Sequence, residues 1–267
     1  MHPFQITPDQ PIDLNDFPTR DEALFPVSKS EGKKLFRDYQ TQIKELQTRL
    51  FAEEKHRLLF VIQAMDTGGK DGTIRDVFDP MAPQGIRVVS FKKPTKEELS
   101  HDYLWRIHKH VPSNGQVTVF NRSHYEDIAA VRVRELVPEE RWRKRFEHIR
   151  NFETMLIDEG TTIIKIFLHI SLDEQKERLQ ARLDEPAKNW KFNEDDLIDR
   201  GLWPKHMEAY TDIVNQTSTE ESPWYVIPAD RKWYRNLVVS QILIDRLEAL
   251  EMEYPSTDFD PKSIHIE

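Results

Sequence analysis

Five short runs of apolar residues alternate along the chain with longer stretches in which apolar residues recur every three or four positions. Each short run is nearly continuous and rich in β-branched or aromatic residues, as expected of strands that are covered on both faces. The runs are residues 57–64, 87–91, 116–120, 162–170 and 224–229. Strands that alternate with helices predict an α/β three-layer sandwich around a five-stranded parallel sheet.

The longer stretches predict seven helices, at residues 29–54, 70–78, 95–108, 138–158, 171–183, 203–215 and 231–252. In the first of them, an apolar stripe recurs at helical spacing. Two others begin with the residues of a capping box, Thr95 with Glu98 and Ser171 with Glu174.

Proline and acidic residues dominate residues 1–28, which we interpret as an extended arm rather than a packed element. Residues 29–253 carry all the predicted strands and helices and are interpreted as a single domain. Residues 254–267 are polar with little periodicity and are interpreted as a C-terminal tail.

The composition restricts the possible functions. A chain of 267 residues is long enough for one large α/β domain. It has no apolar run of membrane-spanning length, no signal-like N-terminus and no cysteine, which together favour a soluble cytoplasmic protein. The net charge of −9 disfavours non-specific binding to nucleic acid. The ten histidines show no metal-ligand spacing.

The segment between the first strand and the next helix reads Ala64-Met65-Asp66-Thr67-Gly68-Gly69-Lys70-Asp71-Gly72-Thr73. Glycines allow backbone amides to approach an anion, the following helix directs its positive end toward that anion, and lysine adds a full charge. The pattern departs from the usual G-x-x-x-x-G-K-[ST], because Ala64 replaces the first glycine and Asp71 replaces the hydroxyl residue. The alternative is a glycine-rich turn that binds no ligand.

A second group of polar residues follows the third strand, where Asn121 and Arg122 precede Glu126 and Asp127. Phosphoryl-transfer sites commonly place a metal-binding Asp at the end of such a strand, and Asn121 occupies that position here. The planar guanidinium of Arg122 suits phosphate oxygens. Glu126 and Asp127 are interpreted as groups that position a magnesium ion or contact an acceptor nucleotide; the alternative is that they cap the next helical turn.

With these motifs, residues 64–72, 120–127 and 224–229, the chain resembles the polyphosphate kinase 2 family from about residue 30 to residue 253. The resemblance implies a P-loop kinase fold similar to thymidylate kinases, with a helical lid at about residues 179–204. It implies transfer of phosphoryl groups between inorganic polyphosphate and nucleotides, reversibly and with Mg²⁺ or Mn²⁺. The sequence Asn121-Arg122-Ser123-His124-Tyr125-Glu126 resembles the branch that accepts both AMP and ADP, giving ADP and ATP; guanine nucleotides are a further possibility. Relatives commonly form homotetramers.

We assign roles to the site residues on this basis. The predicted catalytic residues are Asp66, Lys70, Asn121, Arg122, Glu126 and Asp127, with Asp66 as the metal ligand. The predicted phosphate and polyphosphate contacts are Gly68, Gly69, Lys70, Asp71, Gly72, Thr73, Arg178, Arg182, Lys188 and Lys191. The predicted nucleotide contacts are Arg75, Asp79, Lys92, Lys93, Pro94, Arg106, Arg122 and Glu126.

Two other functions remain open from the sequence. One is a nucleoside monophosphate kinase that uses ATP as donor on a similar fold, although the missing hydroxyl residue after Lys70 counts against it. The other is a phosphate-binding module without catalysis, although the presence of Asp66, Lys70 and Arg122 counts against it.

Overall fold

The computed structural model describes residues 2–260 and 263–266. The five predicted strands are confirmed and form one parallel sheet in the order β2-β3-β1-β4-β5. Their bounds lie within one or two residues of the predicted ones: β1 Arg57–Ala64, β2 Ile86–Ser90, β3 Val117–Asn121, β4 Thr161–His169 and β5 Trp224–Pro228. The apolar runs are buried on both faces in β1, β3, β4 and β5, which explains their continuous character.

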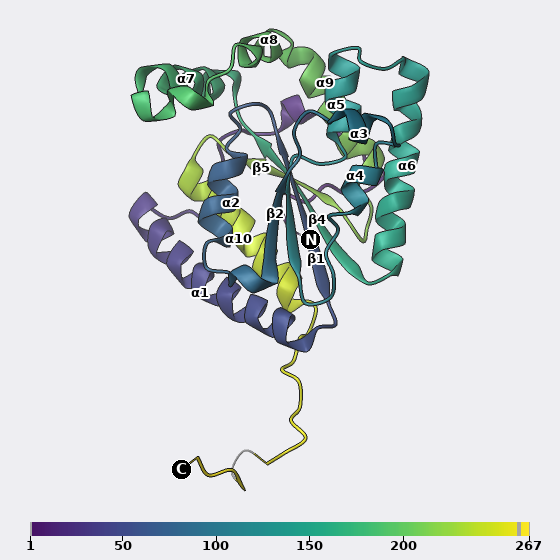
Figure 1. The fold of residues 1–267 in the computed structure, drawn as a ribbon. Helices are drawn as coiled ribbons and strands as arrows, with labels where there is room; N and C mark the ends of the chain where they lie inside the picture. Colours follow the sequence, from purple (N-terminus) through teal and green to yellow (C-terminus); the bar gives the residue numbers. More distant parts are fainter. Residues whose placement is uncertain (1, 261–262, 267) are drawn as a thin grey trace.

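Helices cover both faces of the sheet, as predicted for a three-layer sandwich (Figure 1). On one face, α10 (Lys232–Glu248) packs against α1 (Lys29–Glu53) and α2 (Lys70–Phe78). On the other face, α5 (Glu126–Val133), α6 (Glu139–Asp158) and α9 (Trp203–Thr217) contact one another. The helices α7 (Leu172–Asp184) and α8 (Asp195–Gly201) lie beyond the carboxyl end of the sheet, joined by the 3₁₀ helix η3 (Pro186–Lys191). None of the described helices is long and apolar enough to cross a bilayer.

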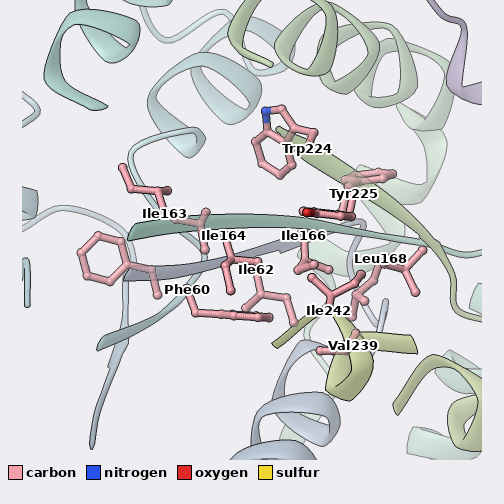
Figure 2. Close-up of a cluster of buried hydrophobic side chains, with 14 of the residues drawn as sticks. Phe60, Ile62, Ile163, Ile164, Ile166, Leu168, Trp224, Tyr225, Val239 and Ile242 are labelled. Carbon is pink, nitrogen blue, oxygen red and sulfur yellow. The ribbon is translucent and has the colours of Figure 1, made fainter. Parts of the chain in front are cut away.

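The central strands and α10 form the densest part of the core. Figure 2 shows side chains of β1 and β4 beside Val239 and Ile242 of α10 on one side of the sheet, with Trp224 of β5 on the other. Each of these side chains is almost fully removed from water. This burial fixes the sheet, and therefore fixes where the loops that follow the strands lie.

The N-terminal arm is extended, but the prediction that it does not pack is wrong. Its residue Gln5 forms an antiparallel bridge with Tyr225, and the amide of Ile6 donates to the carbonyl of Trp224 at 2.8 Å. Phe4 and Ile6 are buried, as is Leu14 in the short 3₁₀ helix η1 (Leu14–Asp16). The arm therefore covers the outer edge of β5, which would otherwise present unpaired backbone groups.

The helix predicted at 95–108 is also wrong, because the chain forms two single turns, α3 (Lys96–Leu99) and α4 (Trp105–His108). The capping box of Thr95 and Glu98 is present at the first. The break follows from Asp102, whose Oδ1 accepts hydrogen bonds from the amides of Leu104 at 3.0 Å and Trp105 at 3.1 Å. Short polar side chains that bond nearby amides in this way compete with a continuous helix. The short helix η2 (Pro83–Gly85), before β2, was not predicted.

Candidate active site

The topology brings the two predicted motifs together. The strand order reverses at β1, since β3 and β2 lie on one side of it and β4 and β5 on the other. Ligands of such sheets bind at the carboxyl ends of the strands, where the order reverses. In the register of the sheet, Ile62 of β1 is paired with Asn121 of β3, and the amide of Arg122 donates to the carbonyl of Ile62 at 3.2 Å. The glycine turn and the polar residues after β3 are therefore neighbours.

The turn after β1 requires its glycines. A Cβ atom on Gly68 would collide with Ala64 and lie 2.8 Å from the carbonyl oxygen of Met65. Gly69, with φ of 99°, stands directly before α2 in the left-handed region, where a side chain is strained. The amide of Gly68 already donates to Met65 O at 2.9 Å, so it stabilises the turn itself. That amide was predicted to bind phosphate, and the contact stays a prediction.

Lys70 is the buried cation of this turn. Its Nζ donates to the carbonyls of Ala64 at 3.0 Å and Met65 at 3.3 Å. Burial, followed by the positive charge of Arg122, lowers the pKa of Lys70 to about 8, although the carboxylates of Asp66, Glu126 and Asp71 act in the opposite direction. A cation that burial disfavours gains stability when an anion binds beside it.

A second buried cation, Arg235 of α10, lies against the same turn and was not predicted from the sequence. A Cβ on Gly69 would collide with its Nη1, and a Cβ on Gly72 would lie 3.7 Å from its Nη2. Within the part of the chain that the structure describes, Arg235 forms no ion pair with a carboxylate; its Nε and Nη2 donate to the side chain of Asn236. Burial, followed by the charge of Arg178, lowers its pKa to about 10. Two buried cations, Lys70 and Arg235, thus contact this turn.

Asn121 and Asp71 are hydrogen bonded, with Nδ2 of Asn121 donating to Oδ1 of Asp71 at 2.6 Å. The usual site has a hydroxyl residue after the lysine and an aspartate at the end of the strand. Here the carboxylate stands on the helix and the uncharged group on the strand, so the two positions have exchanged their chemistry. Magnesium in such sites is commonly bound by one or two carboxylates together with substrate phosphates. Asp66, the predicted metal ligand, and Asp71 are the carboxylates of this turn, and the metal role of Asp66 stays a prediction. Residues 2–260 and 263–266 contain no group of three or more His, Asp or Glu arranged to hold a metal by themselves.

Asp66, Arg122 and Glu126 lie together as predicted. Nη2 of Arg122 donates to Oδ1 of Asp66 at 2.7 Å. The negative charge of Glu126, and to a smaller extent that of Asp66, raises the pKa of Arg122. The three side chains line one cavity of about 60 Å³, which α7, α8 and α9 close on the far side. Gln63 of β1, which was not predicted as a site residue, holds Glu126 in place. Its amide nitrogen donates to the carboxylate of Glu126 at 2.9 Å, and its amide oxygen accepts from Ser123. Arg122 is in the left-handed region, with φ of 62°, a strained conformation typical of functional loops.

Asp127, in contrast, points away from this cavity and contacts two arginines. Nη2 of Arg106 donates to it at 3.4 Å and Nη1 of Arg145 at 3.3 Å. Both arginines are buried, and Nη1 of Arg106 also donates to the carbonyl of Lys92 at 2.9 Å. This cluster connects α4, α5 and α6, so the geometry shows Asp127 joining these helices, and the catalytic role predicted for it stays a prediction.

The predicted polyphosphate contacts on α7 and the lid are mostly occupied by protein partners. Arg178 donates from all three nitrogens of its guanidinium, to Glu174 at 2.7 Å, to the carbonyl of Thr67 at 3.0 Å and to the carbonyl of Ala229 at 2.7 Å. Arg182 pairs with Asp196 at 2.8 Å. Two further lid cations remain near the surface: Lys188 pairs with Glu185, and Nζ of Lys191 lies over the ring of Trp190.

The other predicted nucleotide contacts are more scattered. Lys92, Lys93 and Pro94 follow β2, two strands away from the glycine turn, with both lysines exposed. Arg75 is exposed and pairs with Asp76 at 2.8 Å. Asp79 is the C-cap of α2, at the end of that helix remote from the turn, and the structure does not bring it to the site. Thr73 is buried and donates to the carbonyl of Gly69 at 3.1 Å.

The comparisons with known proteins agree with this geometry. A profile of the polyphosphate kinase 2 family matches residues 26–255. The AMP/ADP-polyphosphate phosphotransferase of Meiothermus ruber is 51% identical over 267 residues, which cover all of both chains. The ADP-polyphosphate phosphotransferase of Rhodopseudomonas palustris is 43% identical over 266 residues, covering 95% of this chain and 92% of that one.

A solved structure is similar along nearly the whole chain. The crystal structure of polyphosphate kinase 2 from Arthrobacter aurescens TC1 has a TM-score of 0.94 and 42% sequence identity, covering 97% of this chain and 93% of that one. The fold, the glycine turn with Lys70 and the profile match together show that this chain belongs to the polyphosphate kinase 2 family.

Proposed function

We propose that the protein transfers the terminal phosphoryl group of inorganic polyphosphate to AMP and to ADP, giving ADP and ATP. One observation carries this proposal: two buried cations, Lys70 and Arg235, flank the glycine turn, and burial lowers the pKa of each. A polyanion that binds there restores the charge balance. The names of the relatives from Meiothermus ruber and Rhodopseudomonas palustris support the same donor and acceptors.

The transfer itself needs little covalent chemistry from the protein. A terminal oxygen of the acceptor phosphate attacks the end phosphorus of the polymer; the new P–O bond forms, the phosphoanhydride bond breaks, and the polymer is shortened by one phosphate. Lys70 and Arg235 bind the donor, while Arg122 lies between the donor turn and the acceptor side and stabilises charge on the transferred group. A divalent ion, Mg²⁺ or Mn²⁺ held by Asp66 and Asp71, would neutralise charge on the phosphate oxygens.

We also propose an oligomeric state and a cellular location for the protein. A homotetramer in the cytoplasm is expected from the family resemblance.

The choice of donor tests the proposal most directly. Formation of ADP from AMP is measured with polyphosphate or with ATP as donor at equal concentrations of phosphoanhydride bonds. We expect polyphosphate to support turnover and ATP to be a poor donor. Turnover with ATP and none with polyphosphate of any length would instead identify an ATP-dependent monophosphate kinase, and no turnover with either donor would favour a binding module.

The position of Glu126 leads to a prediction about the acceptor. Glu126 lies in the cavity with Asp66 and Arg122 and is held by Gln63. We expect Glu126→Asn to lower kcat/KM for AMP by roughly 10- to 150-fold and that for ADP less, because loss of one charged hydrogen bond of this kind costs roughly 1.5–3 kcal/mol. The measurement is kcat/KM for each acceptor at saturating polyphosphate, with Glu147→Asn, an exposed glutamate of α6, as the control. Equal losses on both acceptors would contradict the assignment.

A further inference from the structure

Two side chains of α7 hold the backbone of the glycine turn from outside. Nε2 of Gln175 donates to the carbonyl of Asp66 at 3.1 Å, and Nη1 of Arg178 donates to the carbonyl of Thr67 at 3.0 Å. Residues three apart on a helix share one face, so both side chains reach the turn together. The two consecutive carbonyls they hold lie on the residues just before Gly68.

This part of the turn has a strained backbone. Thr67 has φ of 60°, in the left-handed region, and its buried Oγ1 has no hydrogen-bond partner among the residues that the structure describes. A β-branched residue persists in that region only where its surroundings hold it. Because each peptide group is planar, a fixed carbonyl also fixes the direction of the next amide. The bonds from α7 therefore maintain the shape of the turn that presents Gly69 and Lys70.

Gln175 also contacts the lid (residues 179–204 as predicted). Its Oε1 accepts from Nη1 of Arg200 on α8 at 3.0 Å, and the same nitrogen donates to the carbonyl of Leu172 at 2.7 Å. Gln175 is 1% exposed, so water cannot readily take over either bond. One amide side chain thus bridges the lid and the backbone of Asp66, whose carboxylate pairs with Arg122.

We propose that Gln175 is a positioning residue that couples the lid, through Arg200, to the phosphate-binding turn, through Asp66. An amide suits this role because it donates on one side and accepts on the other. When Arg200 contacts Gln175, the donor to Asp66 is oriented and the Asp66–Arg122 pair is aligned for transfer. Without the contact from Arg200, the amide is free to rotate and this alignment is lost. The coupling rests on the proposed function only for its effect on turnover; the contacts themselves do not depend on which substrate binds.

The first test needs no substrate. Hydrogen–deuterium exchange of the peptide that covers residues 64–73 is compared between the wild type, Gln175→Met and Arg200→Met. The matched control is Gln180→Met, an exposed glutamine of the same helix whose amide donates to Asp184 and not to the turn. We expect exchange to accelerate about tenfold in both variants and to stay unchanged in the control, since local opening follows the loss of holding contacts. Wild-type exchange in Arg200→Met would overturn the coupling, whatever the donor of the reaction is.

The second test is kinetic. We expect each single variant to lower kcat about tenfold with KM for polyphosphate and AMP within about twofold, because small misplacements of reacting groups reduce turnover more than binding. The double variant should be no slower than the slower single one, since both substitutions break the same link. Multiplied losses in the double variant, or losses in KM alone, would overturn the proposal. Gln175→Glu serves if Gln175→Met folds poorly, because its carboxylate keeps an acceptor for Arg200 while it replaces the donor to Asp66 by an oxygen that the carbonyl repels.

Discussion

Replacing Lys70 by alanine is expected to lower kcat by about two to three orders of magnitude, the scale seen when a preorganised charge-stabilising group is lost. Lys70 is buried, donates to two carbonyls of its own turn and has its pKa lowered to about 8. An incoming phosphate would replace those carbonyls as the partner of Nζ and restore the full charge. Alanine removes this charge without altering the glycines that shape the turn.

The measurement is steady-state turnover with polyphosphate and AMP, with thermal unfolding to confirm that the variant is folded. Lys55→Ala is the matched control, because Lys55 is exposed and precedes β1 at the opposite end of the sheet. A folded Lys70→Ala protein that keeps more than about a tenth of wild-type turnover would remove Lys70 from the proposed chemistry.

A buried ion pair beneath the second motif leads to the largest expected effect on stability. Nζ of Lys165 on β4 donates to Glu153 of α6 at 2.7 Å, to the carbonyl of Thr217 at 2.6 Å and to the hydroxyl of Tyr125 at 3.4 Å, so all three protons of an ammonium have acceptors. Glu153 also accepts from Tyr125 at 2.7 Å and contacts His124 at 3.1 Å. Every member is almost fully buried.

We expect Glu153→Gln to lower the free energy of unfolding by about 3–5 kcal/mol, because it leaves the charge of Lys165 buried and unpaired. For a chain of this size the melting temperature should fall by roughly 10 °C. Thermal unfolding measures the change, and Glu147→Gln, an exposed glutamate of the same helix, is the control. A shift as small as that of the control would show that the pair contributes little.

The same pair predicts sensitivity to acid. Burial alone would raise the pKa of Glu153, but Lys165 and His124 outweigh it and lower the pKa from 4.5 to about 2. A carboxylate with a lowered pKa in the folded state stabilises the fold above its ordinary pKa. This contribution should therefore be lost as pH falls from about 4.5 toward about 2, and the loss should be absent in Glu153→Gln.

Much of the fold was predictable because its signals are local. The strands β1 and β4 are continuous apolar runs. The turn after β1 has no room for a side chain at Gly68 or Gly69, and both glycines can be read directly from the sequence. The break at Asp102 was local too, but a side chain that bonds its neighbours’ amides looks the same in sequence as one that faces water.

The parts of the site that the sequence did not predict depend on contacts between residues that are far apart along the chain. Nothing in the sequence places Arg145, from another helix, beside Asp127. Arg235 reads as a surface cation of α10 until its guanidinium is found against Gly69. The one available signal was its place among the buried apolar residues of that helix, near the end that follows β5. Such pairings follow from the topology of the sheet, which sequence periodicity does not specify.

The N-terminal arm has a consequence for biosynthesis. Phe4 and Ile6 are translated long before the strand with which they pair, Trp224–Pro228. The arm therefore cannot close on the sheet until that strand has been synthesised. Closure of the arm consequently depends on completion of β5, and it then shields the edge of the sheet from aggregation.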